Sequence, residues 1–161
     1  MKVGRMDVPK LTELFRALNA HEVDYVLVGA LAMAANGLVR STEDVDLFVR
    51  PEATNVARLR AALHDVWDDP HIEEITAEDL AGEYPAIEYV PPVGDFSLDL
   101  LARLGEAFRF EDIESHRVDW EGEPVVCATP RMLVRMKRDT VRPQDRADAA
   151  ALREKFSLGE D

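Results

Sequence analysis

The sequence of 161 residues contains a single cysteine, Cys127. A lone cysteine excludes both an intrachain disulfide and a metal cluster built on cysteine ligands. No apolar run approaches the ~20 residues that a membrane-spanning helix needs. The first ten residues lack the apolar segment of a secretory signal peptide. We therefore expect a cytoplasmic protein with no membrane partner.

Basic residues are also scarce, since 32 Asp and Glu outnumber 19 Lys and Arg and leave a net charge of −13. Residues 65–123 hold 18 acidic and three basic residues, whereas residues 131–146 hold six basic and two acidic ones. This balance excludes a general nucleic-acid coat, because neutralisation of phosphates dominates such binding. A locally basic cleft could still hold a nucleotide or one end of an RNA. The simplest interpretation of the acidic block is a solvated surface that keeps the protein soluble.

The length and the apolar fraction of 47% are typical of one globular domain. We expect a single domain over 1–161, with a core at about 22–128 and C-terminal helices at about 130–156. Apolar periodicity and capping residues predict helices over 9–20, 30–36, 51–66, 76–84, 130–140 and 144–156. Short apolar or alternating runs predict strands over 25–28, 44–49, 87–90 and 96–101, and a hairpin of 116–120 with 124–128. The expected fold class is α+β, with a small mixed β-sheet flanked by helices.

The strongest chemical signal is the sequence Asp44-Val45-Asp46 within a predicted strand. Alternation along a strand places Asp44 and Asp46 on one face, with Cα atoms about 7 Å apart. Paired carboxylates favour a bound divalent cation, and ligands that are all oxygen suit Mg²⁺ or Mn²⁺. Asp99 lies inside another apolar strand, where a carboxylate is costly unless it is paired or metal-bound. The alternative is that these are surface acids on exposed strand faces.

Residues suited to phosphate binding flank this motif. Gly29 and Ala30 follow a predicted strand and open a helix, so free backbone N–H groups lie there. Arg40, Ser41 and Thr42 supply a guanidinium and two hydroxyls immediately before the acidic strand. A phosphate cradle, a cation and metal-binding carboxylates are the parts that phosphoryl or nucleotidyl transfer requires.

These residues resemble the nucleotidyltransferase-fold superfamily, whose members look like DNA polymerase beta in miniature. In that family a strand ends in Gly-Ser or Gly-Gly and is followed by a short helix and then by D-x-D or D-x-E. Here Gly29-Ala30 is followed by thirteen residues and then by Asp44 and Asp46. The segment from Gly37 to Leu47 is most similar to the AbiEii-type branch, the toxin half of type IV toxin–antitoxin pairs.

A late segment extends the resemblance, which covers about 10–155. The AbiEii-type branch carries a Lys followed by Arg and Asp on two helices, and Lys137, Arg142, Asp145 and Asp148 match that order. One position departs from the family: Ala30 stands where Ser or Gly is usual. The alanine methyl cannot supply the hydroxyl that binds a triphosphate oxygen, although its backbone N–H remains.

The resemblance implies a role for each matching residue. Asp44, Asp46 and Asp99 would bind the metal, and Asp99 would also activate the attacking hydroxyl. The nucleotide-binding set implied by the resemblance is Gly29, Ala30, Arg40, Ser41, Thr42, Lys137, Arg142 and Asp145. Lys137 would neutralise phosphate charge and is counted among the catalytic residues.

The function implied is Mg²⁺-dependent transfer of a nucleoside monophosphate from an NTP to an acceptor hydroxyl. The resemblance further suggests an RNA, such as tRNA, or a protein as the acceptor, and a cognate antitoxin as a partner. One alternative is a non-catalytic module of the same fold that binds a ligand or partner, which Ala30 and the acidic block favour. A second is a glycosyltransferase, because those enzymes also use D-x-D to hold a nucleotide-sugar.

Overall fold

The computed structural model describes residues 7–38, 43–83, 86–104, 108–137 and 143–158. Its centre is a six-stranded mixed sheet with the strand order β3-β4-β2-β1-β8-β7. The strands are β1 (Tyr25–Val28), β2 (Asp44–Val49), β3 (Ala86–Tyr89), β4 (Ser97–Leu101), β7 (Ser115–Trp120) and β8 (Glu123–Ala128). The helices are α1 (Val8–Ala20), α2 (Gly29–Ala35), α3 (Ala53–Val66), α4 (Ala77–Ala81), α5 (Pro130–Lys137) and α6 (Pro143–Phe156).

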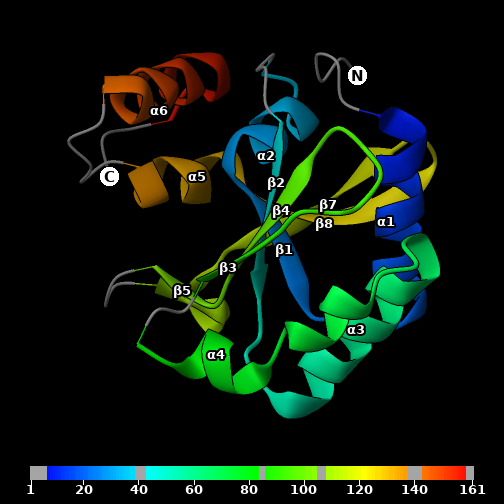
Figure 1. Ribbon diagram of the computed structural model, residues 1–161. Coiled ribbons are helices and arrows are strands. Elements are labelled where there is room, and N and C mark those ends of the chain that lie inside the picture. The colour runs from blue at the N-terminus through cyan, green and yellow to red at the C-terminus, as the bar shows by residue number, and fades with distance from the viewer. Residues whose placement is uncertain (1–6, 39–42, 84–85, 105–107, 138–142, 159–161) are drawn as a thin grey trace.

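The helices form layers on the two sides of this sheet. Helices α1 and α3 lie on one side, and α5 and α6 lie on the other (Figure 1). Strand β2 pairs antiparallel with β1 and parallel with β4, so the sheet is mixed at its centre. This arrangement confirms the α+β fold class predicted from the sequence.

The packing of α1 shows how apolar periodicity becomes a core. Its residues Leu11, Leu14 and Leu18 are fully buried, as spacing by three and four residues requires for one helix face. Phe15 completes that face and packs against Trp120, with ring centroids 5.7 Å apart. Asp7 begins the helix because its side chain accepts a hydrogen bond from the backbone N–H of Lys10.

Asn55 ties three elements together at one end of the sheet. It is 3% exposed and lies on α3. Its amide oxygen accepts a hydrogen bond from the backbone N–H of Asp24, and its amide nitrogen donates to the carbonyl oxygens of Asp24 and Arg50. The start of β1, the end of β2 and the first turn of α3 are therefore held by a single buried side chain.

The middle of the chain differs most from the prediction. The helix expected over 76–84 covers only Ala77–Ala81, because Gly82 takes an extended backbone conformation. Thr76 caps it as expected, accepting a hydrogen bond from the N–H of Asp79. The sequence did not predict the 3₁₀ helices Pro70–Glu74 and Phe110–Asp112, nor the hairpin of β5 (Arg103–Leu104) and β6 (Phe108–Arg109).

Cys127 and the two tryptophans serve packing. Burial raises the pKa of the Cys127 thiol to about 12, which makes it unsuited to nucleophilic chemistry. Trp67 stacks edge-on against Tyr89 and Phe96.

Within the described ranges, no helix has the length and apolar character needed to cross a membrane.

Candidate functional site

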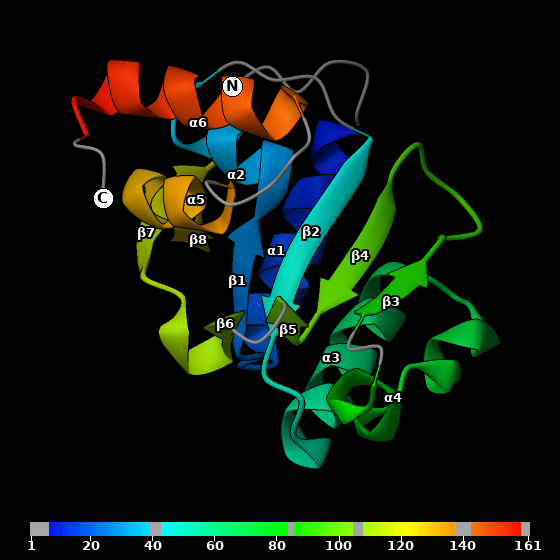
Figure 2. The same ribbon diagram turned by 90° about the vertical axis from the view of Figure 1, so that its left-hand side faces the viewer.

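The register between β2 and β4 brings the predicted acids together. Asp46 lies opposite Asp99, and Asp44 lies opposite Ser97. Since residues paired across strands share a face, all four side chains lie on the same side of the sheet. Figure 2 shows β2 and β4 side by side, seen from the side that carries α5 and α6. Val45 alternates to the other face and is fully buried.

Asp46 and Asp99 interact directly, and the ionisation of Asp46 reflects it. The pKa of Asp46 is raised to about 7, first by burial, then by the hydrogen bond and the negative charge of Asp99, and then by the charge of Asp44. The positive charge of Lys137 acts in the opposite direction. At neutral pH the carboxyl group of Asp46 is therefore poised between its protonated and ionised forms.

Gly29 makes room for the Asp46 carboxylate. Val28 pairs with Asp46 across β1 and β2, so the turn from β1 into α2 passes beside that carboxylate. A Cβ atom at Gly29 would lie 2.9 Å from Asp46 Cγ and would collide with Oδ2, and the backbone has a φ of +73°. Both the left-handed conformation and the close approach require glycine.

Lys137 is the last described residue of α5 and approaches the aspartates from the layer formed by α5 and α6. Its Nζ lies 3.0 Å from Asp145 Oδ1 and 3.3 Å from Asp148 Oδ2. Asp148 is 4% exposed and also accepts a hydrogen bond from Gln144. Lys137 thus joins α5 to α6 and at the same time places its charge where it acts on Asp46.

The metal-binding role that the sequence predicts for the three aspartates stays a prediction. In the part of the chain that the structure describes, no group of three or more His, Cys, Asp or Glu side chains is arranged to hold a metal ion. The Asp44 carboxylate accepts a hydrogen bond of 2.7 Å from Ser97 Oγ, while Asp46 and Asp99 contact each other.

Other expected site residues divide into those that can be placed and those that cannot. Gly29 and Ala30 open α2, and Asp145 lies beside Lys137. Arg40, Ser41, Thr42 and Arg142 lie outside the described residues.

Two polar residues at this site were missed by the sequence analysis. Ser97 stands two residues before Asp99, as Asp44 stands two before Asp46, so the repeated spacing could have identified it. Glu88 lies opposite Asp99 on β3 and is exposed. The position of Glu88 opposite Asp99 follows from the register of β3 and β4, which could not be inferred from the sequence.

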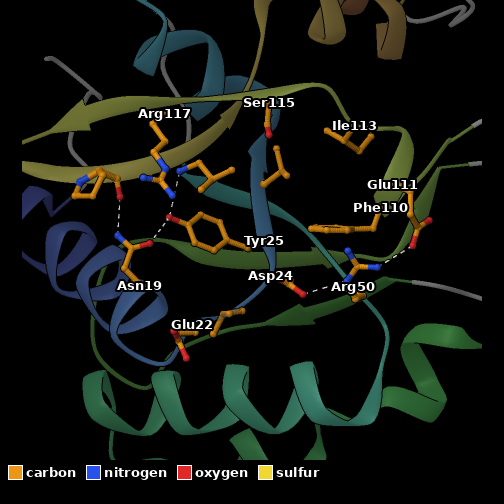
Figure 3. A pocket seen from close by; sticks show the side chains of 14 residues that line it. Asn19, Glu22, Asp24, Tyr25, Arg50, Phe110, Glu111, Ile113, Ser115 and Arg117 are labelled. Carbon is orange, nitrogen blue, oxygen red and sulfur yellow. Dashed lines mark hydrogen bonds and ion pairs between the residues drawn. The ribbon is translucent and has the colours of Figure 1, made fainter.

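One cavity lies away from the aspartates. It has a volume of about 740 Å³, begins where β1 starts, and is bounded by β7, β8 and the segment 110–113 (Figure 3). Tyr25 forms part of its wall: its hydroxyl donates to Asn19 Oδ1 and accepts from the N–H of Val126. Burial raises the pKa of Tyr25 to about 12.

Comparison with known proteins identifies the fold. No family model matches the sequence, and no curated protein matches it. The structure is similar to ANT(2″)-Ia solved in complex with adenylyl-2″-tobramycin (TM-score 0.57, 14% identity, 92% of this chain and 88% of that one). It is similar to a putative nucleotidyltransferase from Thermotoga maritima (TM-score 0.57, 12% identity, 91% and 89% covered). It is also similar to an antigenic nucleotidyltransferase-like protein from Paracoccidioides brasiliensis (TM-score 0.57, 16% identity, 92% and 75% covered). The chain therefore has a nucleotidyltransferase fold.

Proposed function

We propose that this protein is a Mg²⁺-dependent nucleotidyltransferase that moves a nucleoside monophosphate from an NTP to an acceptor hydroxyl. The observation that carries the proposal is the contact between Asp46 and Asp99 beside the Gly29 turn. Such a pair on neighbouring strands needs a function, because like charges held together at a partly buried position cost stability. The nucleotidyltransferase fold supports the same reading.

The donor set fits a divalent cation of the magnesium type. Asp46 and Asp99 offer carboxylate oxygens from adjacent strands, and Asp44 offers another on the same face. Hard cations such as Mg²⁺ prefer oxygen ligands. Asp44, Asp46 and Asp99 would hold the ion, and when bound it would offset the negative charge of the phosphates.

The residues of the chain itself would orient and deprotonate the acceptor. A carboxylate oxygen of Asp99 takes the proton of the acceptor hydroxyl, and the acceptor oxygen then forms a bond to the α-phosphorus. The bond from that phosphorus to the bridging oxygen of the β-phosphate breaks, and pyrophosphate leaves. Lys137 places positive charge toward this face, which favours the anionic substrate.

The acceptor and the biological role are further parts of the proposal. The resemblance to the AbiEii-type branch supports an RNA end or a protein as acceptor, and a toxin paired with a cognate antitoxin. The neighbour solved with adenylyl-2″-tobramycin supports a small hydroxylated molecule as another acceptor. A protein bearing a net charge of −13 would bind an RNA only at a local basic surface.

The test uses each NTP labelled at the α-phosphate, incubated with the protein, Mg²⁺ and total cellular RNA. We expect label to transfer to an acceptor with the wild type and to be lost with Asp46→Asn and with Asp99→Asn. Asp68→Asn is the matched control, because Asp68 is an exposed acid that lies in no strand and outside the aspartate site. Transfer that survives in Asp46→Asn would overturn the assignment.

A non-catalytic module with the same fold is the second candidate, and two observations favour it. Ala30 lacks the hydroxyl of the usual serine, and Lys137 is engaged by Asp145 and Asp148. Such a module would show NTP-dependent thermal stabilisation without transfer of label. The glycosyltransferase alternative is disfavoured, because the chain has a nucleotidyltransferase fold.

A further inference from the structure

A second cavity, of about 290 Å³, lies against the hairpin that follows β4. It shares Arg50, Phe110 and Glu111 with the larger cavity of Figure 3. Apolar residues form part of its wall, including the buried Leu80 and Ala102. This volume accommodates a phosphate group together with a small organic group esterified to it.

Two arginines of the hairpin face each other at this cavity. Arg103 on β5 lies opposite Arg109 on β6, and both line the cavity. Residues opposed in this way have Cβ atoms about 4.5–5.5 Å apart, and like charges at such positions destabilise a hairpin. Among the residues that the structure describes, no acidic side chain forms an ion pair with either guanidinium.

The acidic residues that line the cavity form ion pairs with a third arginine, Arg50. Arg50 Nη1 lies 3.0 Å from Glu111 and 3.8 Å from Glu52, and its Nε lies 3.1 Å from Asp24. Its guanidinium also lies over the ring of Phe110, 4.6 Å from the centroid. Figure 3 shows Arg50 held between Asp24 and Glu111. These acids therefore pair with Arg50, and the Asp112 carboxylate near the hairpin accepts a hydrogen bond from the backbone N–H of Arg109, with no ion pair to its guanidinium.

The local sequence makes this cation pair unusual. Residues 65–123 contain 18 acidic residues and only three basic ones, which are Arg103, Arg109 and Arg117. Two of those three oppose each other at one cavity. Beside them, the first turn of α3 contains no acidic residue, and its N-cap residue Glu52 makes no side-chain capping hydrogen bond.

We propose that Arg103 and Arg109 form an oxyanion site that binds a phosphate group, either as orthophosphate or as a phosphomonoester. A phosphate dianion between the two guanidinium groups would convert their repulsion into two attractive contacts. The planar fork of arginine matches phosphate oxygens with paired N–H donors. None of these residues belongs to the aspartate site, so this proposal stands apart from the nucleotidyl-transfer proposal.

The test is calorimetric titration of the full chain with sodium phosphate and with glycerol 3-phosphate. EDTA is present, and NaCl holds the ionic strength constant. We expect saturable binding by the wild type, and about tenfold or greater weakening in Arg103→Gln and in Arg109→Gln, because each removes charge-assisted hydrogen bonds. Arg109→Lys keeps the charge but loses the fork, so its affinity should fall between those of the wild type and Arg109→Gln.

Two controls separate this site from the others. Arg58→Gln removes an exposed arginine on α3 and should leave the affinity unchanged. Asp46→Asn should also leave it unchanged, whereas loss of binding in Asp46→Asn alone would assign the phosphate to the aspartate site. Tighter binding of glycerol 3-phosphate than of orthophosphate would identify a phosphomonoester as the ligand, and the reverse order would identify free phosphate. Absence of saturable binding by the wild type, or equal binding by the Arg103 and Arg109 variants, would overturn the proposal.

Discussion

At Asp46, the carboxyl group that the proposed chemistry requires occupies a position that costs folding stability. Burial first, then the hydrogen bond and negative charge of Asp99, and then the charge of Asp44 raise the pKa of this carboxyl group to about 7. A surface acid that served only solubility would not be placed there. The opposing influence of Lys137 shows that the C-terminal helices, although distant in sequence, belong to the same electrostatic environment.

The first prediction concerns the pH dependence of stability in Asp46→Asn. Between the ordinary pKa of 3.8 and about 7, the folded protein keeps a proton on Asp46 that the unfolded chain has released. The contribution of Asp46 to the free energy of unfolding therefore falls as the pH rises through this range, by about 1.4 kcal/mol for each pKa unit at most. The asparagine variant lacks this loss and should gain stability relative to the wild type as the pH rises.

Urea denaturation of both proteins in EDTA, at several pH values from 4 to 8, would measure the difference. We expect it to grow up to about pH 7 and then to level off. A difference that does not change with pH would mean that Asp46 is fully ionised in the folded protein. A variant far less stable than the wild type at every pH would show that Asp46 is a structural residue.

The second prediction concerns Gly29→Ala. The new Cβ meets the Asp46 carboxylate, and the residue must also hold a φ of +73°. Gly122→Ala is a matched control, because Gly122 has a φ of +85° and open space around its Cβ position. The left-handed conformation alone costs about 1 kcal/mol for alanine, so the excess loss in Gly29→Ala reports the clash.

A double-mutant cycle with Asp46→Ala isolates that clash. Removing the carboxylate should recover most of the excess loss in Gly29→Ala, measured as the free energy of unfolding, while the Cβ of residue 46 stays 3.1 Å from the new Cβ. Independent, additive effects of the two substitutions would contradict the close approach of Gly29 and Asp46.

At the scale of elements, the sequence predicted the strands and the hairpin of 116–120 with 124–128, but not the order of the strands in the sheet. Local alternation correctly placed 44–49 as a strand with Asp44 and Asp46 on one face. Nothing local indicates that β2 lies between β1 and β4, because the strand order depends on contacts between distant segments. The convergence of Asp99 on Asp46 was inferred from its costly position in an apolar strand, and the register then supplied the reason.

The elements that were missed are short and held by tertiary contacts. The hairpin of β5 and β6 has two residues in each strand, too few for a periodic pattern. The 3₁₀ helix Pro70–Glu74 begins with Asp69, whose side chain accepts hydrogen bonds from the N–H of His71 and from the hydroxyl of Tyr89. Tyr89 lies twenty residues away on β3, so this anchor was invisible to local reasoning.

The third prediction concerns Asn55, which connects β1, β2 and α3. Asn55→Ala removes three hydrogen bonds and leaves a backbone N–H and two carbonyl oxygens without these partners in a buried region. We expect a loss of about 2–4 kcal/mol in the free energy of unfolding. The adjacent exposed Thr54 provides the control, since Thr54→Ala should change it by less than about 0.5 kcal/mol.

Hydrogen exchange would localise the effect of Asn55→Ala. Faster exchange at the N–H of Asp24 and in the first turn of α3, with little change in β7 and β8, would confirm the local brace. Uniform acceleration across the sheet would mean instead that the bonds of Asn55 matter mainly to global stability.

At the scale of the whole molecule, the distribution of charge is the dominant feature. The net charge of −13 is concentrated in residues 65–123, whereas the C-terminal segment 131–146 is basic. The compact state holds like charges closer together than the unfolded chain does, so self-repulsion lowers stability at low salt. The ion pairs of Arg50 and of Lys137 offset this only locally.

The fourth prediction is that chloride salts stabilise the protein. Raising NaCl from 0.01 M to 0.15 M shortens the screening length from about 30 Å to about 8 Å, which weakens repulsion across the acidic block more than it weakens short ion pairs. The free energy of unfolding should therefore rise with NaCl and then level off.

Two charge-neutralising substitutions at exposed positions provide the controls. Glu114→Gln removes one negative charge from the acidic block and should reduce the dependence on salt, whereas Arg58→Gln removes a positive charge and should increase it. Chloride is used rather than sulfate, because sulfate stabilises folded proteins through exclusion from their surfaces. A stability that falls as NaCl rises would show that ion pairs such as that of Lys137 with Asp145 outweigh the repulsion. It would also mean that the acidic side chains of residues 65–123 lie too far from one another in the fold for their repulsion to cost stability.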